Sequence, residues 1–445
     1  MRVVWIASAA YAVIFFLLGL DRYATYHSGA DLGIFTQAIA NAGHGMRDTY
    51  EHGSHWAFHF SPILYLCAPL LWATQSAVAL IAIQAIATAL VTPALHLIAR
   101  KRTSERNAAA IACIALLYPP LQGVTFTDFH EDAFAPAAVV WLLWAIDARR
   151  FAIAGALLAV VLSIKEDQAP AMAFLGLAGL VYFGASVARD DKTARRGLLF
   201  SGVGVLASVV VFVAYFSLVR PMAGAHGSWI PEHFYAWGAH APALPLWKQI
   251  AGRLTYLLEV FVPLAFIPLR SRVLLLSLPG FVEVLASREP LTYTMGQHYA
   301  AVWIPYVLVA FAIGGSALLN GGIRRGVVLV RASAILCIVV SIFFSPLHLG
   351  HFLGRPTASD AEINALIGKL PRSASIGTYD EIYAHLGFFP NAAVGVAGDP
   401  EYVIYGTQYR SVYWNGTVLP KIDQAVTAGI YHPVSEKSGV VLLRR

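Results

Sequence analysis

The sequence predicts a polytopic α-helical membrane protein that carries a small α/β domain at its C-terminal end. Of its 445 residues, 58% are hydrophobic and only 13% are charged, whereas soluble domains carry about 25% charged residues. The mean hydropathy is +0.63, and many apolar runs approach the roughly 20 residues needed to cross a bilayer. From about residue 356 onward, polar residues, glycines and alternating patterns replace these runs.

The apolar runs predict about eleven transmembrane helices. The first is expected to be retained rather than cleaved as a signal peptide, because its ASAAYA sequence falls before the apolar run ends. Several runs are short, so we expect them to pack on neighbouring helices or to break at a proline. The predicted spans are residues 3–20, 76–99, 107–121, 133–147, 151–165, 169–187, 197–219, 249–268, 272–286, 298–319 and 327–347.

Basic residues set the expected orientation, since cytoplasmic loops of membrane proteins collect Lys and Arg. If the basic loops and the N-terminus face the cytoplasm, segment 59–73 does not cross the membrane and forms a re-entrant or interfacial helix. The formal charge of +6 then serves topology, and no nucleic-acid partner is expected. The basic residues gather at 100–106, 149–150, 189–196, 270–272 and 324–325.

The remaining loops are poor in Lys and Arg and rich in His, acidic and aromatic residues, and all of them fall on the opposite face. Their convergence predicts a single active site on the extracytoplasmic side of the cell inner (cytoplasmic) membrane. These loops are residues 21–59, 125–132, 164–168, 220–247 and 287–299.

We divide the chain into a transmembrane domain of residues 1–350 and an extracytoplasmic α/β domain of residues 356–445. In the second domain, the segments NALIGKL, DEIYAHL and KIDQAVTAG predict helices, and SASIGTY, EYVIYG and GVVLLRR predict strands. The three cysteines, Cys67, Cys113 and Cys337, lie in apolar runs, which indicates small buried side chains rather than disulfides or metal ligands.

The first external loop, residues 21–59, is the longest polar interruption of the membrane domain. Its segment SGADLGIFTQAIANAG predicts an amphipathic helix with Leu32, Phe35, Ile39 and Ala42 on one face, lying flat on the outer membrane surface. Asp31 in this helix is a candidate catalytic carboxylate if it faces a cavity. The alternative is that Ser28 caps the helix and that Asp31 completes the cap. The same loop also carries Asp48, Glu51 and the histidines His27, His44, His52, His55 and His59.

The turn DFHED places Asp128, His130, Glu131 and Asp132 within five positions. Like charges this close repel one another, so one acid is expected to hold a proton or to share a cation. Asp128, His130 and Glu131 are candidate ligands for a divalent cation such as Mg²⁺ or Mn²⁺. The alternative is that Asp128 caps the next helix and that the other groups are hydrated at the membrane edge.

The turn KED, which follows an apolar run, presents Lys165 and Glu166 at the membrane edge. These two residues either neutralise each other, or Lys165 offers a cation to a phosphate that Glu166 helps to orient. Arg220 is a further candidate binding residue. The remaining candidates have the alternative role of hydrogen-bonded structural groups, and they are His59, His226, His233, Gln297 and His298.

Several motifs together carry a resemblance to a known family. DLGIFTQAI followed by HFSPILYL, then YPPLQGVTFTDFHEDAFAP, KED between two spans and a polar C-terminal tail resemble a prokaryotic family of predicted membrane proteins of the domain-of-unknown-function type. That family is in turn similar to the GT-C glycosyltransferase superfamily, multi-spanning enzymes that use polyprenyl-phosphate sugars on the extracytoplasmic face. The first external loop of GT-C enzymes supplies the catalytic carboxylate, and the best matching position here is Asp31. Some members have paired acids there, where this chain has Gly29-Ala30-Asp31.

The resemblance implies a GT-C-like membrane glycosyltransferase that inverts configuration, with Asp31 as general base on the hydroxyl of a glycan, lipid or protein acceptor. Glu131 and Lys165 are the other candidate catalytic residues. Lys165, Arg220 or a cation bound by the DFHED turn would stabilise the departing polyprenyl phosphate. The alternative function is a transporter or lipid-handling protein that uses external acids and histidines for cation or proton coupling.

Overall fold

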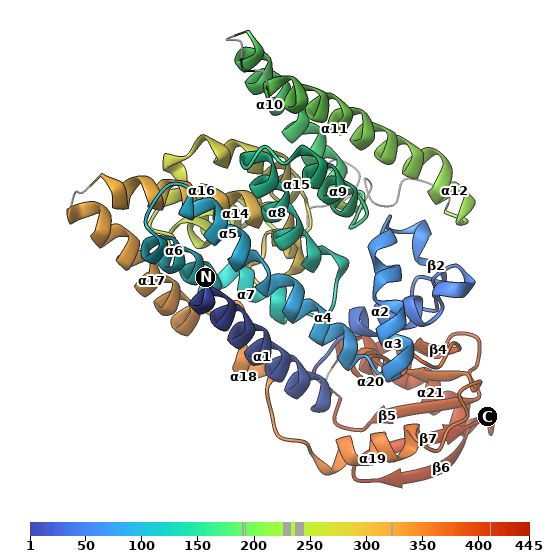
Figure 1. Ribbon diagram of the computed structural model, residues 1–445. Helices are drawn as coiled ribbons and strands as arrows, with labels where there is room; N and C mark the ends of the chain where they lie inside the picture. Colours follow the sequence, from blue (N-terminus) through green and yellow to red (C-terminus); the bar gives the residue numbers. More distant parts are fainter. Residues whose placement is uncertain (189–190, 192, 226–232, 236–243, 322–323, 410) are drawn as a thin grey trace.

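The structure is a computed structural model that describes residues 1–445 except 189–190, 192, 226–232, 236–243, 322–323 and 410. Helices make up most of the chain as far as α18, and a sheet domain formed by the C-terminal residues lies against one end of this bundle, beside α2 and α3 (Figure 1). The N-terminal helix α1 (Arg2–Ala24) runs along the bundle toward the sheet domain.

Each predicted span coincides with a helix or with a pair of consecutive helical segments. Among the described residues, five helices are long and apolar enough to cross a membrane, and the bent pair α6–α7 makes a sixth if it is counted as one span. The five are α1, α4 continued by α5, α10, α11 continued by the helical segments η5 and α12, and α17. The helical segments after α1 and before the C-terminal domain are α2 (Ala30–Ala40), η1 (Ala42–His44), η2 (His55–Ala57), η3 (Pro62–Leu66), α3 (Ala68–Thr74), α4 (Val78–Ala89), α5 (Val91–Arg100), α6 (Glu105–Leu116), α7 (Pro119–Phe126), η4 (Glu131–Phe134), α8 (Ala135–Asp147), α9 (Phe151–Leu162), α10 (Gln168–Val187), α11 (Ala194–Ala214), η5 (Tyr215–Val219), α12 (Arg220–Met222), α14 (Leu246–Phe261), η6 (Ile267–Arg270), η7 (Arg272–Ser277), α15 (Leu278–Ala286), η8 (Pro290–Tyr293), η9 (His298–Val302), α16 (Ile304–Asn320), α17 (Arg324–Phe343) and α18 (Leu349–Phe352).

The expected break at a proline is confirmed in the third span. Helix α6 ends at Leu116, α7 begins at Pro119, and the two helices are bent by 51°. Proline has no backbone N–H to continue the helical ladder, so the chain turns there and leads into the DFHED turn. In segment 59–73, α3 has seven residues, which at about 1.5 Å per residue is too short to cross a bilayer by itself.

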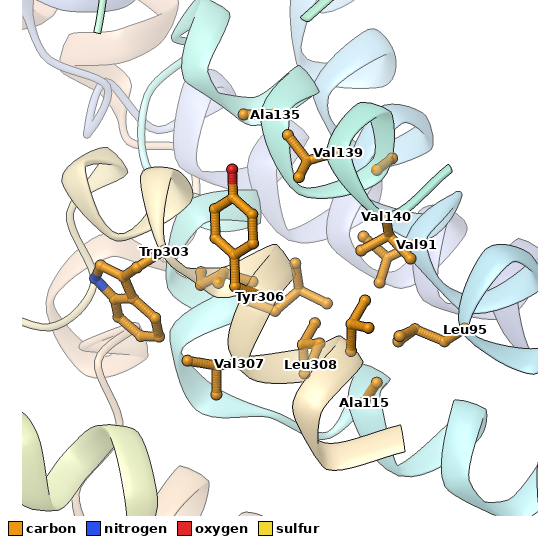
Figure 2. Packing of buried hydrophobic residues seen from close by; sticks show 14 of the residues in the cluster. Val91, Leu95, Ala115, Ala135, Val139, Val140, Trp303, Tyr306, Val307 and Leu308 are labelled. Carbon is orange, nitrogen blue, oxygen red and sulfur yellow. The ribbon is translucent and has the colours of Figure 1, made fainter. Parts of the chain in front are cut away.

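The membrane core is centred on α16, which is buried on nearly all sides. Figure 2 shows side chains from α5, α6 and α8 packed around it and around Trp303, which precedes it. A helix that is apolar all round belongs in the interior of a bundle, so the segment η9 that leads into α16 is held in a fixed frame. The labelled side chains are Val91, Leu95, Ala115, Ala135, Val139, Val140, Trp303, Tyr306, Val307 and Leu308.

The C-terminal domain, defined here as α19 to β7, contains a five-stranded sheet in the order β4-β3-β5-β7-β6. Strand β3 is parallel to β4 and β5, whereas β7 is antiparallel to β5 and β6. All six predicted elements are confirmed, and β4 and β6 were not predicted. The elements are α19 (Ala358–Ile367), β3 (Ile376–Thr378), α20 (Asp380–Tyr383), β4 (Ala392–Val394), β5 (Tyr402–Gly406), η10 (Trp414–Val418), α21 (Leu419–Thr427), β6 (His432–Lys437) and β7 (Val440–Arg444).

Helix α2 differs from the expectation of an amphipathic helix on the membrane surface. Its face of Leu32, Phe35, Ile39 and the following Ala42 packs against η3 and α3, as the spacing predicted. The other face is buried as well, because the C-terminal domain covers it, and Gln37 is completely inaccessible to solvent. Helix α2 is therefore enclosed between the bundle and the sheet domain, and the prediction that it lies flat on the membrane is wrong.

Candidate active site

Asp31 lies in the first turn of α2, and its side chain is 52% exposed, with Oδ2 3.5 Å from Nε2 of His130. The residue at the cap position is Gly29 rather than Ser28, and no side chain caps the helix from within this segment. The alternative role of Asp31 in a cap completed by Ser28 is thus excluded. The carboxylate is left available to solvent and to His130.

The helix start is held by Asp128, whose Oδ2 accepts hydrogen bonds from the Gly29 N–H (2.8 Å) and from Nη2 of Arg22 (3.0 Å). Arg22 also donates to the carbonyls of His27 and Phe126. Asp128 therefore joins the end of α1 to the start of α2, and the expectation that it caps the next helix is wrong. Its carboxylate is engaged in this junction, which fixes the position of Asp31.

His130 is oriented by its backbone neighbours. Its Nδ1 lies 2.9 Å from the Asp128 carbonyl oxygen, to which it can donate, and its Nε2 lies 3.5 Å from Oδ2 of Asp31. Its ring stacks on the ring of His298, with centroids 3.6 Å apart.

Lys165 is surrounded by acids. Its Nζ lies 2.9 Å from Asp132, 3.6 Å from Glu131 and 3.9 Å from Asp167. Burial opposes ionisation of Glu131, but the charges of Lys165 and of His59, His55 and His130 together outweigh it and lower the Glu131 pKa to about 2. Asp132 lies nearer the ammonium, yet burial raises its pKa and the Glu131 charge adds to this. The pKa values of the two carboxylates nearest this one ammonium are therefore shifted in opposite directions.

The predicted pair of Lys165 with Glu166 is not formed. Glu166 instead contacts Nδ1 of His59 (2.9 Å) and accepts the Phe60 N–H (2.7 Å). Burial raises the Glu166 pKa, but His59 outweighs this and the pKa is lowered. Glu166 therefore anchors the start of segment 59–73, while Nε of the buried Arg220 donates to the Ala57 carbonyl (3.0 Å) just before it.

The remaining predicted residues differ in how close they lie to these charged groups. His298 lies 4.0 Å from Asp132, and the half-buried Gln297 directly precedes η9. His233 is exposed and its ring contacts Phe234. His226 lies outside the described residues.

The predicted metal ligands Asp128, His130 and Glu131 do not gather around one point, because each is directed to a different partner. Within the described part of the chain, the group whose ligand atoms lie close enough for a cation is Asp48, Glu51 and His55, with these atoms within 4.8 Å of one another. The sequence contains the signal for this group, two acids and a histidine at i, i+3 and i+7, but such spacing is common in loops without a metal.

A short hairpin builds this second group. Strand β1 (Arg47–Asp48) pairs antiparallel with β2 (Gly53–Ser54), so that the turn between them brings Glu51 beside Asp48. Burial, followed by the Glu51 charge, raises the Asp48 pKa to about 8. Burial disfavours the charged form of His55, but Glu51 at 3.0 Å from Nδ1 raises its pKa to about 9.

The two groups lie on either side of one aromatic ring. Phe35 of α2 contacts the His130 ring (centroids 5.2 Å apart) and the His55 ring (5.3 Å apart). The charges of His59, His55 and His130 all act on Glu131. Asp31, the DFHED turn, Lys165 and the hairpin group therefore lie close together. Their proximity agrees with the expected convergence of these loops, and a single active site there stays a prediction.

Similarity to solved structures agrees with this architecture. The chain matches ArnT from Cupriavidus metallidurans bound to undecaprenyl phosphate with a TM-score of 0.60 and 15% identity, covering 98% of this chain and 97% of that one. For ArnT in the apo state the TM-score is 0.55 at 15% identity, with 98% of each chain covered. The archaeal oligosaccharyltransferase AglB from Archaeoglobus fulgidus, in complex with an inhibitory peptide and a dolichol-phosphate, has a TM-score of 0.45 at 14% identity, covering 92% of this chain and 70% of that one.

The ArnT matches show that the fold is that of GT-C proteins over essentially the whole length, as the resemblance implied. Among proteins of curated function, none matches this chain in sequence. The model of a family described as predicted membrane proteins (DUF2079) matches residues 22–442, and the chain belongs to that family.

Proposed function

We propose that this protein is an inverting membrane glycosyltransferase that transfers a sugar from a polyprenyl-phosphate donor to the hydroxyl of an extracytoplasmic glycan, lipid or protein. The observation that carries this proposal is the placement of Asp31, a half-exposed carboxylate fixed by the Gly29–Asp128–Arg22 junction and facing His130. The transporter alternative expects acids at the bilayer midplane on broken helices, whereas this acid cluster lies in loops and short turns at one end of the bundle.

Asp31 acts as the general base. Its carboxylate takes the proton of the acceptor hydroxyl, the hydroxyl oxygen forms a bond to the anomeric carbon, and the bond from that carbon to the phosphate oxygen breaks. A single displacement inverts the configuration. The surrounding segments reduce the hydration of this carboxylate although half of its side chain stays accessible, and this raises the Asp31 pKa against the opposing effect of His130.

The donor phosphate needs a cation, and we assign this role to Arg220 rather than to Lys165. Three carboxyl groups within 4.0 Å already engage the Lys165 ammonium, so less of its charge is available to a phosphate. Lys165 instead holds Glu131 and Asp132 in place. Arg220 is bonded to η2 through Ala57, next to His55, and a guanidinium binds phosphate oxygens in pairs.

The hairpin group Asp48, Glu51 and His55 fits a divalent cation such as Mg²⁺ or Mn²⁺. Its donors are carboxylate oxygens and an imidazole nitrogen, and the buried atoms Asp48 Oδ2 and His55 Nε2 have no hydrogen-bond partner among the described residues. Since burial and Glu51 raise the pKa values of Asp48 and His55, a cation would bind there by displacing their protons. A cation bound there would add positive charge beside Arg220, where the phosphate charge develops.

The test uses the purified full-length protein in lipid nanodiscs with a panel of undecaprenyl-phosphate sugars and a cell-envelope fraction as the acceptor source. Mass spectrometry should detect released undecaprenyl phosphate and a glycosylated product. Asp31→Asn should lower the rate by about 10²–10⁴-fold and leave binding of undecaprenyl phosphate unchanged. Asp21→Asn, a matched change at the end of α1, should retain the activity. Full activity of Asp31→Asn would exclude Asp31 as the base.

A further inference from the structure

The C-terminal domain is in close contact with the helix that carries Asp31. A β-carbon on Gly33 of α2 would lie 2.5 Å from the Tyr383 ring and 2.9 Å from its carbonyl. A β-carbon on Gly387 would lie 2.3 Å from the Thr36 side chain. Since real β-carbons do not approach other atoms this closely, glycine on each side of the contact allows the helix and the domain to meet without a gap.

The same contact contains a fully bonded buried amide. Oε1 of Gln37 accepts the Tyr383 O–H (2.8 Å) and the Thr49 N–H (2.7 Å). Its Nε2 donates to the carbonyl oxygens of Phe389 (2.8 Å) and Ala392 (3.3 Å). A buried amide with all of these partners defines one relative position of helix and domain, because any displacement leaves polar groups unpaired.

We propose that the C-terminal domain positions the Asp31 carboxylate by holding α2 from the side opposite the bundle, and that Gln37 and Tyr383 are positioning residues. This inference rests on the proposed function of Asp31 as the base. The bundle fixes the cap residue Gly29 through Asp128. The direction of the helix axis also depends on the contacts that Gly33 and Gln37 make with the C-terminal domain. Asp31 lies within one turn of Gly33, so a shift at Tyr383 moves the carboxylate relative to an acceptor.

The C-terminal domain also contributes carboxyl groups whose charges act on Asp31 or on one another. Helix α20 begins with Asp380 and Glu381, and burial, followed by the charges of Asp31 and Asp128, raises the Asp380 pKa. Burial raises the Glu381 pKa to about 7. Because α20 ends at Tyr383, the residue that contacts Gly33, loosening this contact also changes the charges that face Asp31.

Two pairs of variants of the full chain test the inference. Tyr383→Phe removes the O–H bond to Gln37 and keeps the ring, and Tyr26→Phe is its control because the Tyr26 O–H bond to Asn364 (2.9 Å) joins the same domain without touching α2. Gly33→Ala introduces the clash, and Gly43→Ala is its control because nothing lies within 4 Å of the added atom.

Two measurements do not need a substrate. Amide hydrogen exchange over residues 30–40 should be about tenfold faster in Tyr383→Phe and Gly33→Ala than in their controls, since the local opening loses a buried hydrogen bond or a close contact. Modification of Asp31 with a carbodiimide and glycine ethyl ester should change in rate and in pH dependence in the same two variants. If both measurements match the controls, the inference is overturned whether or not the protein is an enzyme.

The third measurement uses the donor identified in the nanodisc assay. Displacement of the base should lower kcat by about 10–100-fold in Tyr383→Phe and Gly33→Ala, with KM for the donor within a factor of about two, because the donor site lies beside η2. An unchanged kcat in variants with faster exchange would overturn the positioning role. A wild-type protein that transfers no sugar, but shows the differences in exchange and modification, would refute the proposed function and leave the structural hold on α2 established.

Discussion

Replacement of Lys165 by methionine tests how the site balances its buried charges. Methionine keeps most of the length of the side chain and removes the ammonium. In the wild-type protein this ammonium is the strongest attraction acting on Glu131, and neither carboxylate oxygen of Glu131 has a hydrogen-bond partner among the described residues. The variant therefore removes the largest attraction on a fully buried acid and leaves it with the charges of His59, His55 and His130.

The magnitude follows from the Glu131 pKa. An ordinary glutamate titrates near 4.3, and each pKa unit corresponds to about 1.4 kcal/mol, so a pKa of about 2 corresponds to about 3 kcal/mol of stability. This contribution is present above pH ~4.5 and is lost as the pH falls toward ~2. Removing one partner of a buried ion pair costs about 3–5 kcal/mol in other proteins, which agrees with the value obtained from the Glu131 pKa. With an unfolding entropy of ~2.1 cal/mol/K per residue, 445 residues give a Tm lower by about 3–5 °C.

Thermal unfolding followed by tryptophan fluorescence measures this shift at pH 7 in nanodiscs. Lys101→Met is the matched control, because Lys101 forms an exposed ion pair with Asp147 (3.1 Å), which also has Arg102 as a partner. Exposed pairs contribute about 0–1 kcal/mol, so this Tm should change by about 1 °C or less. Adding Asp132→Asn to Lys165→Met should recover part of the loss. A Tm for Lys165→Met no lower than that of Lys101→Met would refute the charge balance described for this site.

Three further predictions concern the base, the cation and the loop before η9. The pH–rate profile of the wild type should have its acid limb above the usual aspartate range, since loss of hydration raises the Asp31 pKa and only the ionised form is a base. His55→Gln should weaken Mn²⁺ binding, measured by titration calorimetry, at least about tenfold, whereas the exposed His52→Gln should bind as the wild type does. Gly123→Ala adds an atom 2.7 Å from the backbone of the loop before η9 and should lower stability by about 1–3 kcal/mol in thermal unfolding, whereas Gly155→Ala, with nothing within 4 Å, should not.

The fold was largely predictable because apolar run length and turn chemistry are local properties. The bend at Pro119 and the strands EYVIYG and GVVLLRR follow from residues within a few positions of one another. Strand β6, HPVSEK, was not predictable in this way, because it lies at the edge of its sheet with five of its six residues exposed and has no apolar alternation. Strand β4 has only three residues, which is too few for a period to be read.

The environment of α2 shows a second kind of limit. The pattern of Leu32, Phe35 and Ile39 correctly identified the face that packs on the bundle. The opposite face, with Gly33 and Gln37, resembles the polar side of a surface helix, because glycine and glutamine are also common at solvent-exposed positions. Only the C-terminal domain, 346 positions away for the Gln37–Tyr383 bond, turns these residues into a buried contact.

The region in which the site residues lie could be predicted from the sequence, but the role of each residue could not. Hydrophobic spans force the polar turns to the ends of a bundle, so Asp31, His130 and Lys165 could be placed in one region from the sequence. Their partners depend on distant segments: Asp128 pairs with Arg22 across 106 positions, and Lys165 with Asp132 across 33. A lysine beside a membrane edge favours a phosphate ligand only while its charge is unopposed. In the structure, three carboxyl groups already engage the Lys165 ammonium, and the residues beside Lys165 in the sequence do not reveal the contribution of Glu131 and Asp132.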